Sequence, residues 1–282
     1  MPKMHPEQQL SIARNSEGAT SMAVISPVGG ALLKLSLQGT SIIDATGVVG
    51  VEDMFFGSIL APWPNRLENH TYSFSGQTYS TPNVDSDNNS NHGLVFNREF
   101  EVVSHNAEAV ELRYQLGQDQ SYPFDVELSV RYEISIDAMR VTASALNRGI
   151  VAPFGFGFHP YFLAGKNFRV RADFNRQILA NERMIPVSSR EIEGFDYTGG
   201  ALDDCFSGSH QVTLEAETYS ASIHIDEGFD YFMLYRPSES VGKSLLAIEP
   251  MSCLTNAFNS HPDSVLLQSG EIKKFVFSIK KN

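Results

Sequence analysis

The sequence predicts an all-β protein built from antiparallel sheets. Apolar and polar side chains alternate with a period of two over several stretches, most clearly over residues 122–136, and this pattern is typical of a half-buried antiparallel strand. Gly, Asn, Ser and Pro separate the stretches, and no stretch forms a convincing amphipathic helix. Many short strands without helices indicate a sandwich or a barrel.

The same alternation recurs in order along the chain. It is present at 110–116, 122–136, 141–145 and 219–225, and again at 275–279 near the end of the sequence. In each stretch, residues of one parity are apolar and their neighbours are mostly polar, so one face of each strand is expected to be buried.

Composition and length favour one domain. The hydrophobic fraction of 42% and the charged fraction of 19% are those of an ordinary globular protein. No change in composition marks a linker, no internal repeat is visible, and the polar tract at 83–91 is typical of a single loop. We expect residues 1–282 to form a single domain.

The charge balance excludes some classes of partner. Lys+Arg 21 against Asp+Glu 33 gives a net charge of −12 without a basic stripe, which is unsuited to nucleic acid or to an anionic membrane. Residues 1–15 lack the apolar core of a signal peptide, so a soluble cytoplasmic protein is expected. Cys205 and Cys253 have no metal-ligand spacing, and we expect free thiols without a function.

The stretch 153–162 combines an unusual strand with a candidate functional residue. Phe and Gly alternate up to His159, which is followed by Pro160. Large rings are therefore expected on one face and bare backbone on the other, where another backbone or a ligand comes close. Because Pro160 cannot donate to a sheet, the strand is expected to end there. The pattern predicts that His159 is an acid or a base beside a glycine-lined ligand surface.

Glu249 is the second candidate for proton transfer. It follows four consecutive apolar residues, 245–248, which predict a strand buried on both faces that ends at the glutamate. A glutamate in such a place must be paired, or must lie in a cavity where its pKa is tuned.

Polar residues that suit a sugar occur at two further places. Two prolines fix the loop at 61–66, and the indole of Trp63, the amide of Asn65 and the guanidinium of Arg66 suit a ring with many hydroxyls. His92 precedes a glycine at a loop-to-strand junction, where an imidazole can point at a ligand. Taken alone, each pattern is also typical of a surface turn.

An acidic pair and a set of metal-ligand side chains leave alternatives open. Asp203 and Asp204 lie in a predicted loop, where carboxylates are usually solvated or cap a turn. His92, His159 and Glu249 are ligand types for a metal, but no short His-x-His or H-E-x-x-H spacing is present. We therefore favour an acid/base site without a metal.

In chain order, these pieces resemble the aldose 1-epimerase (mutarotase) family. The resemblance extends from about residue 57 to 259. The matching motifs are Pro64-Asn65-Arg66, His92-Gly93, Phe158-His159-Pro160-Tyr161-Phe162, Asp203-x-x-Phe206, and Glu249-Pro250 leading to Asn256-Ala257-Phe258-Asn259.

The resemblance implies a β-supersandwich of large stacked sheets and an isomerase that interconverts the α and β anomers of an aldose without a cofactor. It implies that Glu249 is the general base and His159 the general acid, and that Asn65, Arg66, His92 and Asp203 bind the sugar. Two departures bear on substrate choice. Asp204 follows Asp203 where a histidine is common, and residues 254–256 read Leu-Thr-Asn where many relatives have a proline and an aspartate.

The chemistry suits these residue types. Anomer exchange removes the proton from the C1 hydroxyl and protonates the ring oxygen, and one base and one acid suffice for this. Two alternatives stay open. A mutarotase for a phosphorylated or otherwise modified sugar would require a second cationic group near the cleft. A non-catalytic carbohydrate-binding protein would require neither an acid nor a base.

Overall fold

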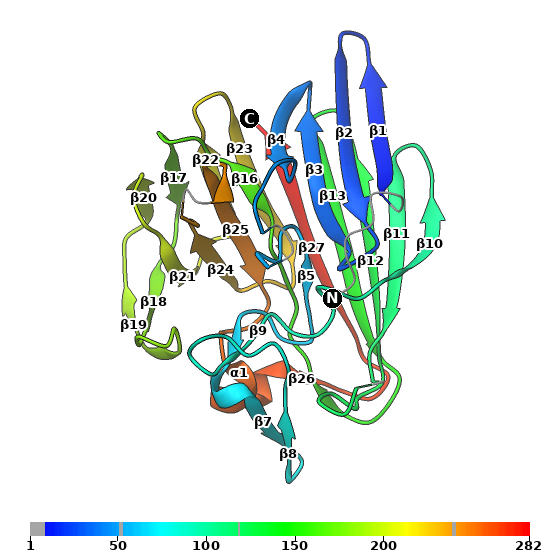
Figure 1. Cartoon of the computed structure of the whole chain (residues 1–282), viewed down its shortest axis with the longest axis vertical. Helices are drawn as coiled ribbons and strands as arrows, with labels where there is room; N and C mark the ends of the chain where they lie inside the picture. The colour runs from blue at the N-terminus through cyan, green and yellow to red at the C-terminus, as the bar shows by residue number, and fades with distance from the viewer. Residues whose placement is uncertain (1–8, 51–52, 118, 239–240) are drawn as a thin grey trace.

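The computed structural model describes residues 9–50, 53–117, 119–238 and 241–282, and Figure 1 shows their arrangement. Residues 1–8, where the sequence predicts no signal peptide, lie outside this part. Strands dominate, as the sequence predicts; the one α-helix in the described ranges is α1 (Ala257–Ser260), with short 3₁₀ turns at Glu68–His70 and Pro262–Val265. None of the helices described is long and apolar enough to cross a membrane.

The strands form three larger sheets, each with antiparallel pairing throughout. The nine-stranded sheet has the order β10 (Glu101–His105), β11 (Ala109–Gln115), β12 (Val126–Ile134), β13 (Ala138–Asn147), β27 (Ile272–Lys281), β23 (Ser220–Glu227), β22 (Gln211–Glu215), β17 (Arg169–Ala172) and β20 (Phe195–Thr198).

The eight-stranded sheet has the order β19 (Pro186–Glu191), β18 (Arg176–Ala180), β21 (Asp203–Ser207), β24 (Tyr231–Tyr235), β25 (Leu245–Met251), β15 (Gly157–Phe158) and β5 (Ile59–Leu60), and β16 (Tyr161–Leu163) also pairs with β25. The four-stranded sheet is β1 (Leu10–Ser16), β2 (Ala19–Ser26), β3 (Ala31–Leu37) and β4 (Thr40–Asp44). Three short pairs complete the fold: β6 (Arg66–Leu67) with β9 (Ser90–Asn91), β7 (Thr71–Phe74) with β8 (Gln77–Ser80), and β14 (Ala152–Pro153) with β26 (Leu266–Leu267).

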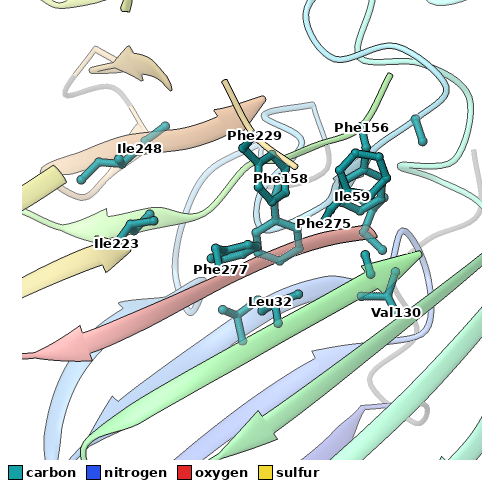
Figure 2. Packing of buried hydrophobic residues seen from close by; sticks show 14 of the residues in the cluster. Leu32, Ile59, Val130, Phe156, Phe158, Ile223, Phe229, Ile248, Phe275 and Phe277 are labelled. Atoms are coloured by element: carbon teal, nitrogen blue, oxygen red, sulfur yellow. The ribbon is translucent and has the colours of Figure 1, made fainter. Parts of the chain in front are cut away.

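These sheets stack as a sandwich, which confirms the predicted fold class. The four-stranded and eight-stranded sheets lie next to each other, because β4 contacts β16, and together they cover the nine-stranded sheet (Figure 1). Side chains from both layers meet in one continuous apolar core, shown in Figure 2. The core residues include Leu32, Ile59, Phe158 and Ile248 from the covering sheets and Val130, Ile223, Phe275 and Phe277 from the nine-stranded sheet.

The predicted alternation is present in the central strands. Along β12, buried residues alternate strictly with partly exposed ones. The strand is shorter than the predicted 122–136, because Pro123 has no N–H to donate before it and the chain turns at Ser135, whose N–H donates to the carbonyl of Ala138.

The Phe/Gly stretch has the predicted two faces, but its glycines do not line a ligand surface. The rings of Phe156 and Phe158 point into the core (Figure 2), where Phe156 stacks on Phe275 with ring centres 4.8 Å apart. On the other face, a Cβ at Gly157 would lie 2.8 Å from Cβ of Pro64. The glycines therefore accommodate the proline loop that positions Asn65 and Arg66, and the expectation of a glycine-lined ligand surface is wrong.

Candidate functional site

His159 and Glu249 face each other because of strand pairing. β15 and β16 both pair with β25, and the register places Gly157 opposite Met251 and Tyr161 opposite Ala247. His159 lies in the gap between β15 and β16, so it is opposite Glu249. The expectation that the strand ends at Glu249 is wrong: β25 continues to Met251, because β24 pairs with it that far.

The same face of this sheet carries a row of further polar and aromatic side chains. Because side chains alternate between faces, residues two apart on a strand share a face. Asp203, opposite Tyr235 on β24, therefore lies on the face of Glu249, and both line the same cavity. Asp204 lies on the other face and accepts a hydrogen bond from Gln177 at 2.8 Å. Of the two aspartates, Asp203 is thus the one at the site.

The short pair β6 and β9 brings Arg66 and His92 over this face. Arg66 is opposite Asn91 in the pairing, and the N–H of His92 donates to the carbonyl of Asn65 at 2.9 Å. Asn65 and His92 both adopt left-handed backbone angles, with φ of 56° and 59°, which asparagine and histidine tolerate better than most residues. This local geometry turns both side chains inwards.

Arg66 is held by two neighbours. Its Nε donates to Asp85 at 3.0 Å and one terminal nitrogen donates to the side-chain oxygen of Asn65 at 3.3 Å. That oxygen also accepts the backbone N–H of Arg66 at 2.9 Å. Asn65 therefore orients the guanidinium, in addition to lining the cavity itself.

The cavity unites all six site residues predicted from the sequence. It has a volume of about 270 Å³, just below the usual range of about 300–1,000 Å³ for small-molecule sites. The six predicted residues, all of which line the cavity, are Asn65, Arg66, His92, His159, Asp203 and Glu249. Residues that sequence reasoning did not assign to the site include Asp53, Phe55, Asn91, Tyr161, Met233 and Tyr235.

The aromatic walls had no distinctive signal in the sequence, because Phe55 and Tyr161 lie in apolar runs that are typical of a core. Phe55 does carry a structural signal: its φ of 55° is unusual for a bulky residue, and such strained backbone is frequent at functional sites.

Trp63 is assigned to the site by the sequence but does not belong to it. Its side chain is 1% exposed and packs edge-on against Phe258, so the predicted indole platform for a sugar is wrong.

His159 and Glu249 form a close, buried pair. Nε2 of His159 lies 3.3 Å from Oε1 of Glu249, and the two side chains are 4% and 2% exposed. Burial lowers the pKa of His159 to about 3. Burial also raises the pKa of Glu249 well above its ordinary value, and the charge of Asp203 adds to this. Both shifts favour the uncharged forms of the two groups, in which the proton of the pair resides on Glu249.

Aromatic stacking orients the imidazole of His159. Tyr161 lies against one side, with ring centres 4.8 Å apart and planes 29° apart, and Phe55 is nearly parallel at 6.4 Å. Within the described ranges, Nδ1 of His159 and Oε2 of Glu249 have no hydrogen-bond partner. Both atoms are buried, and among the described residues no second carboxylate fixes the ring.

The hydrogen bonding of the two histidines bears on metal binding. Ligand atoms of His92, His159 and Glu249 lie within 4.8 Å of one another. However, Nδ1 of His92 accepts the backbone N–H of Asn65 at 3.3 Å, so the neutral ring carries its proton on Nε2. Metal-binding histidines instead donate their second N–H to an acceptor. The trio fits proton transfer better than metal coordination, and His92 presents an N–H donor.

The two cysteines are poorly suited to chemistry of their own. Both are buried, unpaired thiols, and burial raises the pKa of each well above its ordinary value. A protonated, buried thiol is unreactive. Neither residue lines the cavity.

Comparison with known proteins agrees with the fold and identifies the family. The sequence profile of the aldose 1-epimerase family matches residues 13–280. The uncharacterized protein YihR of Escherichia coli K12 is 28% identical over 290 residues, covering 96% of this chain and 92% of YihR. A putative aldose 1-epimerase from Escherichia coli K12 has a similar structure, with a TM-score of 0.79 at 20% identity over 97% of this chain and 99% of that chain.

A galactose 1-epimerase from Lactobacillus acidophilus also has this fold, with a TM-score of 0.74 at 16% identity over 95% of this chain and 92% of that chain. At these identities the solved structures establish the fold alone. The family profile spans nearly the whole sequence, including every residue of the cavity described above. The chain therefore belongs to the aldose 1-epimerase family.

Proposed function

We propose that this protein is a single-domain, cytoplasmic mutarotase that interconverts the α and β anomers of an aldose by general acid/base catalysis. The observation that carries the proposal is the buried His159–Glu249 pair at 3.3 Å, which lies in a cavity lined by hydrogen-bonding groups. A non-catalytic sugar-binding site has no use for two buried groups that share a proton.

In the proposed mechanism, Glu249 removes the proton of the C1 hydroxyl while His159 protonates the ring oxygen. The C1–O5 bond breaks and the C1 carbonyl forms. After rotation about C1–C2, the same groups reverse the transfers on the other face of the carbonyl. Moving the shared proton from Glu249 to His159 creates the base and the acid together, across a distance of 3.3 Å.

The remaining polar groups hold the sugar while C1 rotates. His92 donates from Nε2, Arg66 donates from its second terminal nitrogen, and Asp203 accepts from hydroxyls. These contacts fix the part of the sugar that does not move, which lowers the entropic cost of each ring closure.

The test is polarimetry of freshly dissolved α-glucose and α-galactose with and without the protein. Decay to the equilibrium rotation is expected to be faster than the spontaneous rate for at least one of the two, and a protein with both His159→Asn and Glu249→Gln should restore the spontaneous rate. Acceleration that survives in the double variant would reject these two residues as the acid and base. Sugar binding without acceleration would indicate the non-catalytic alternative.

Tyr161 offers a test of how His159 is positioned. Replacing Tyr161 by Leu removes the ring stacked at 4.8 Å, and such ring contacts contribute about 0.5–1.5 kcal/mol. The turnover number is expected to fall by about 2- to 10-fold, with a smaller change in KM. Tyr161→Phe keeps the ring and should retain most of the wild-type rate. Equal losses in both variants would assign the effect to the hydroxyl and contradict the stacking argument.

A further inference from the structure

The pair of strands that carries Arg66 and His92 is too small to hold these residues by itself. β6 and β9 are two residues long each, and Arg66 lies in β6 while His92 directly follows β9. An isolated pair of strands is at best marginally stable in water. The positions of both side chains in the cavity therefore depend on the contacts that fix this pair.

Asp85 holds Arg66 from a turn of the chain that lies just before β9. Its Oδ2 accepts the Nε–H of Arg66 at 3.0 Å. Its Oδ1 accepts the backbone N–H of Asp87 at 3.0 Å and that of Asn89 at 2.8 Å, which is the turn-closing arrangement that aspartate favours. Because one carboxylate binds both the turn and the guanidinium, the placement of Arg66 follows that of the turn 85–89.

Arg183 fastens this turn from a distant part of the chain, the connection between β18 and β19. Its Nε donates to the carbonyl of Asp87 at 3.1 Å, and Nη2 donates to the side-chain oxygen of Asn89 at 2.9 Å. In return, the side-chain nitrogen of Asn89 donates to the carbonyl of Arg183 at 3.0 Å. Asn89 is fully buried, so these bonds lie inside the turn and not on its surface.

The same guanidinium reaches the other strand of the pair. Nη2 of Arg183 also donates to the side-chain oxygen of Asn69 at 2.9 Å, and Nη1 donates to Glu68 at 3.3 Å. Glu68 directly follows β6, and Asn89 directly precedes β9. Arg183 therefore joins the two antiparallel strands at one end of the pair, and the residues that line the cavity are at the other end.

We propose that Arg183 is a positioning residue of the site: it fixes the turn 85–89 on the β6–β9 pair, so that Asp85 and the pair hold Arg66 and His92 where they bind the substrate. The inference rests on the proposed function, because its effect is measured on sugar turnover. Arg183 does not line the cavity, so it acts through other residues. The rigid fork of a guanidinium suits this role, because it offers several donors in fixed directions.

The experiment measures KM and kcat of Arg183→Met by NMR of anomer exchange, with the aldose that the wild type turns over best. Methionine keeps most of the stem but donates no hydrogen bond. KM is expected to rise at least about 5-fold, the value of one hydrogen bond of ordinary strength. The change in kcat should be smaller, because His159 and Glu249 are placed by β15, β16 and β25, and lost ground-state binding appears in KM.

Arg190→Met is the matched control. Arg190 lies on the same hairpin, but its Nε and Nη2 donate to Gln177 at 2.9 Å and 2.6 Å, from β19 to β18. This variant removes a guanidinium without loosening the β6–β9 pair and should keep the wild-type KM. Urea unfolding verifies that both variants are folded under the assay conditions. Equal KM values for the two variants would overturn the inference.

A double-mutant cycle separates positioning from a general structural effect. Asp85→Asn keeps an acceptor for the turn but removes the charge that faces Arg66. If Arg183 acts through Asp85, the rise in KM for the double variant should be well below the product of the two single effects. A rise equal to the product would mean that the two residues act independently, and would overturn the inference.

Hydrogen exchange and turnover together distinguish the inference from the proposed function. Amide exchange over residues 85–92 should be faster in Arg183→Met, while β25 exchanges as in the wild type. Unchanged exchange over 85–92, or a wild-type KM, overturns the positioning role and leaves the mutarotase proposal standing. A wild-type protein that accelerates no aldose overturns the proposed function and the positioning role with it, whatever the exchange shows.

Discussion

Glu249→Gln is expected to lower kcat by about 10²- to 10⁴-fold, the usual contribution of a positioned general base. Glutamine has the same shape but accepts no proton, so the C1 hydroxyl would keep its hydrogen. KM should change little, because the sugar is held by other groups of the cavity. Polarimetry under saturating aldose measures the effect. A variant with more than a tenth of the wild-type turnover would exclude Glu249 as the base.

The same variant should not be less stable than the wild type, which separates lost chemistry from lost folding. Burial raises the pKa of Glu249 in the folded protein, whereas the unfolded value is about 4.3. As the pH rises above about 4.3, the unfolded state releases this proton first, so the folded state loses stability relative to it. The glutamine of the variant does not titrate, so the variant's advantage in free energy of unfolding should grow with pH above that point.

Urea unfolding of wild type and Glu249→Gln at several pH values measures this difference. His159 contributes a dependence of opposite sign, because its pKa is lowered to about 3 in the folded state. Its stabilising effect is lost as pH falls below about 6.5. Comparing the two proteins at each pH removes most of that contribution. A variant that steadily loses stability relative to the wild type as pH rises would contradict a raised pKa for Glu249.

Gly93→Ala is expected to destabilise the protein by about 2–5 kcal/mol, from the sum of two costs. The φ of 72° at Gly93 costs alanine about 1–2 kcal/mol. In addition, the new Cβ would lie 2.2 Å from the carbonyl oxygen of Ala61, and overpacking of this kind costs about 1–3 kcal/mol. The two segments cannot move apart easily to make room, because the N–H of Leu94 donates to that oxygen at 2.7 Å.

Gly76→Ala is the matched control. Gly76 has a similar φ of 79°, but a Cβ there would meet nothing within 4 Å. The free energy of unfolding of Gly76→Ala should fall only by the conformational cost of about 1–2 kcal/mol. Urea midpoints, interpreted with unchanged slopes, give both values. If the two variants lose the same stability, the close approach to Ala61 does not contribute. Gly93→Ala should also lower activity, because it displaces the neighbouring His92.

The sequence determined the strand content and which residues of the central strands are buried. Alternation with a period of two in β12 and β13 follows directly from the pleated backbone, so no knowledge of their partners was needed. The sequence also indicated that His159 and Glu249 are unusual polar residues next to apolar strands. The roles of Arg66, His92 and Asp203 came from the family resemblance, because their local patterns are equally typical of turns.

Tertiary structure decided which of these residues meet. A strand pattern specifies the two faces of a strand but not its neighbour, and only the register of β15 and β16 on β25 sets His159 opposite Glu249. Face alternation then separates Asp203 from Asp204, once β21 is paired with β24. The large rings could not be assigned from sequence: Trp63, in a proline loop beside Asn65 and Arg66, is buried in the core, whereas Tyr161, in an apolar run, lines the cavity. Their difference arises from packing between segments far apart in sequence, which local periodicity does not encode.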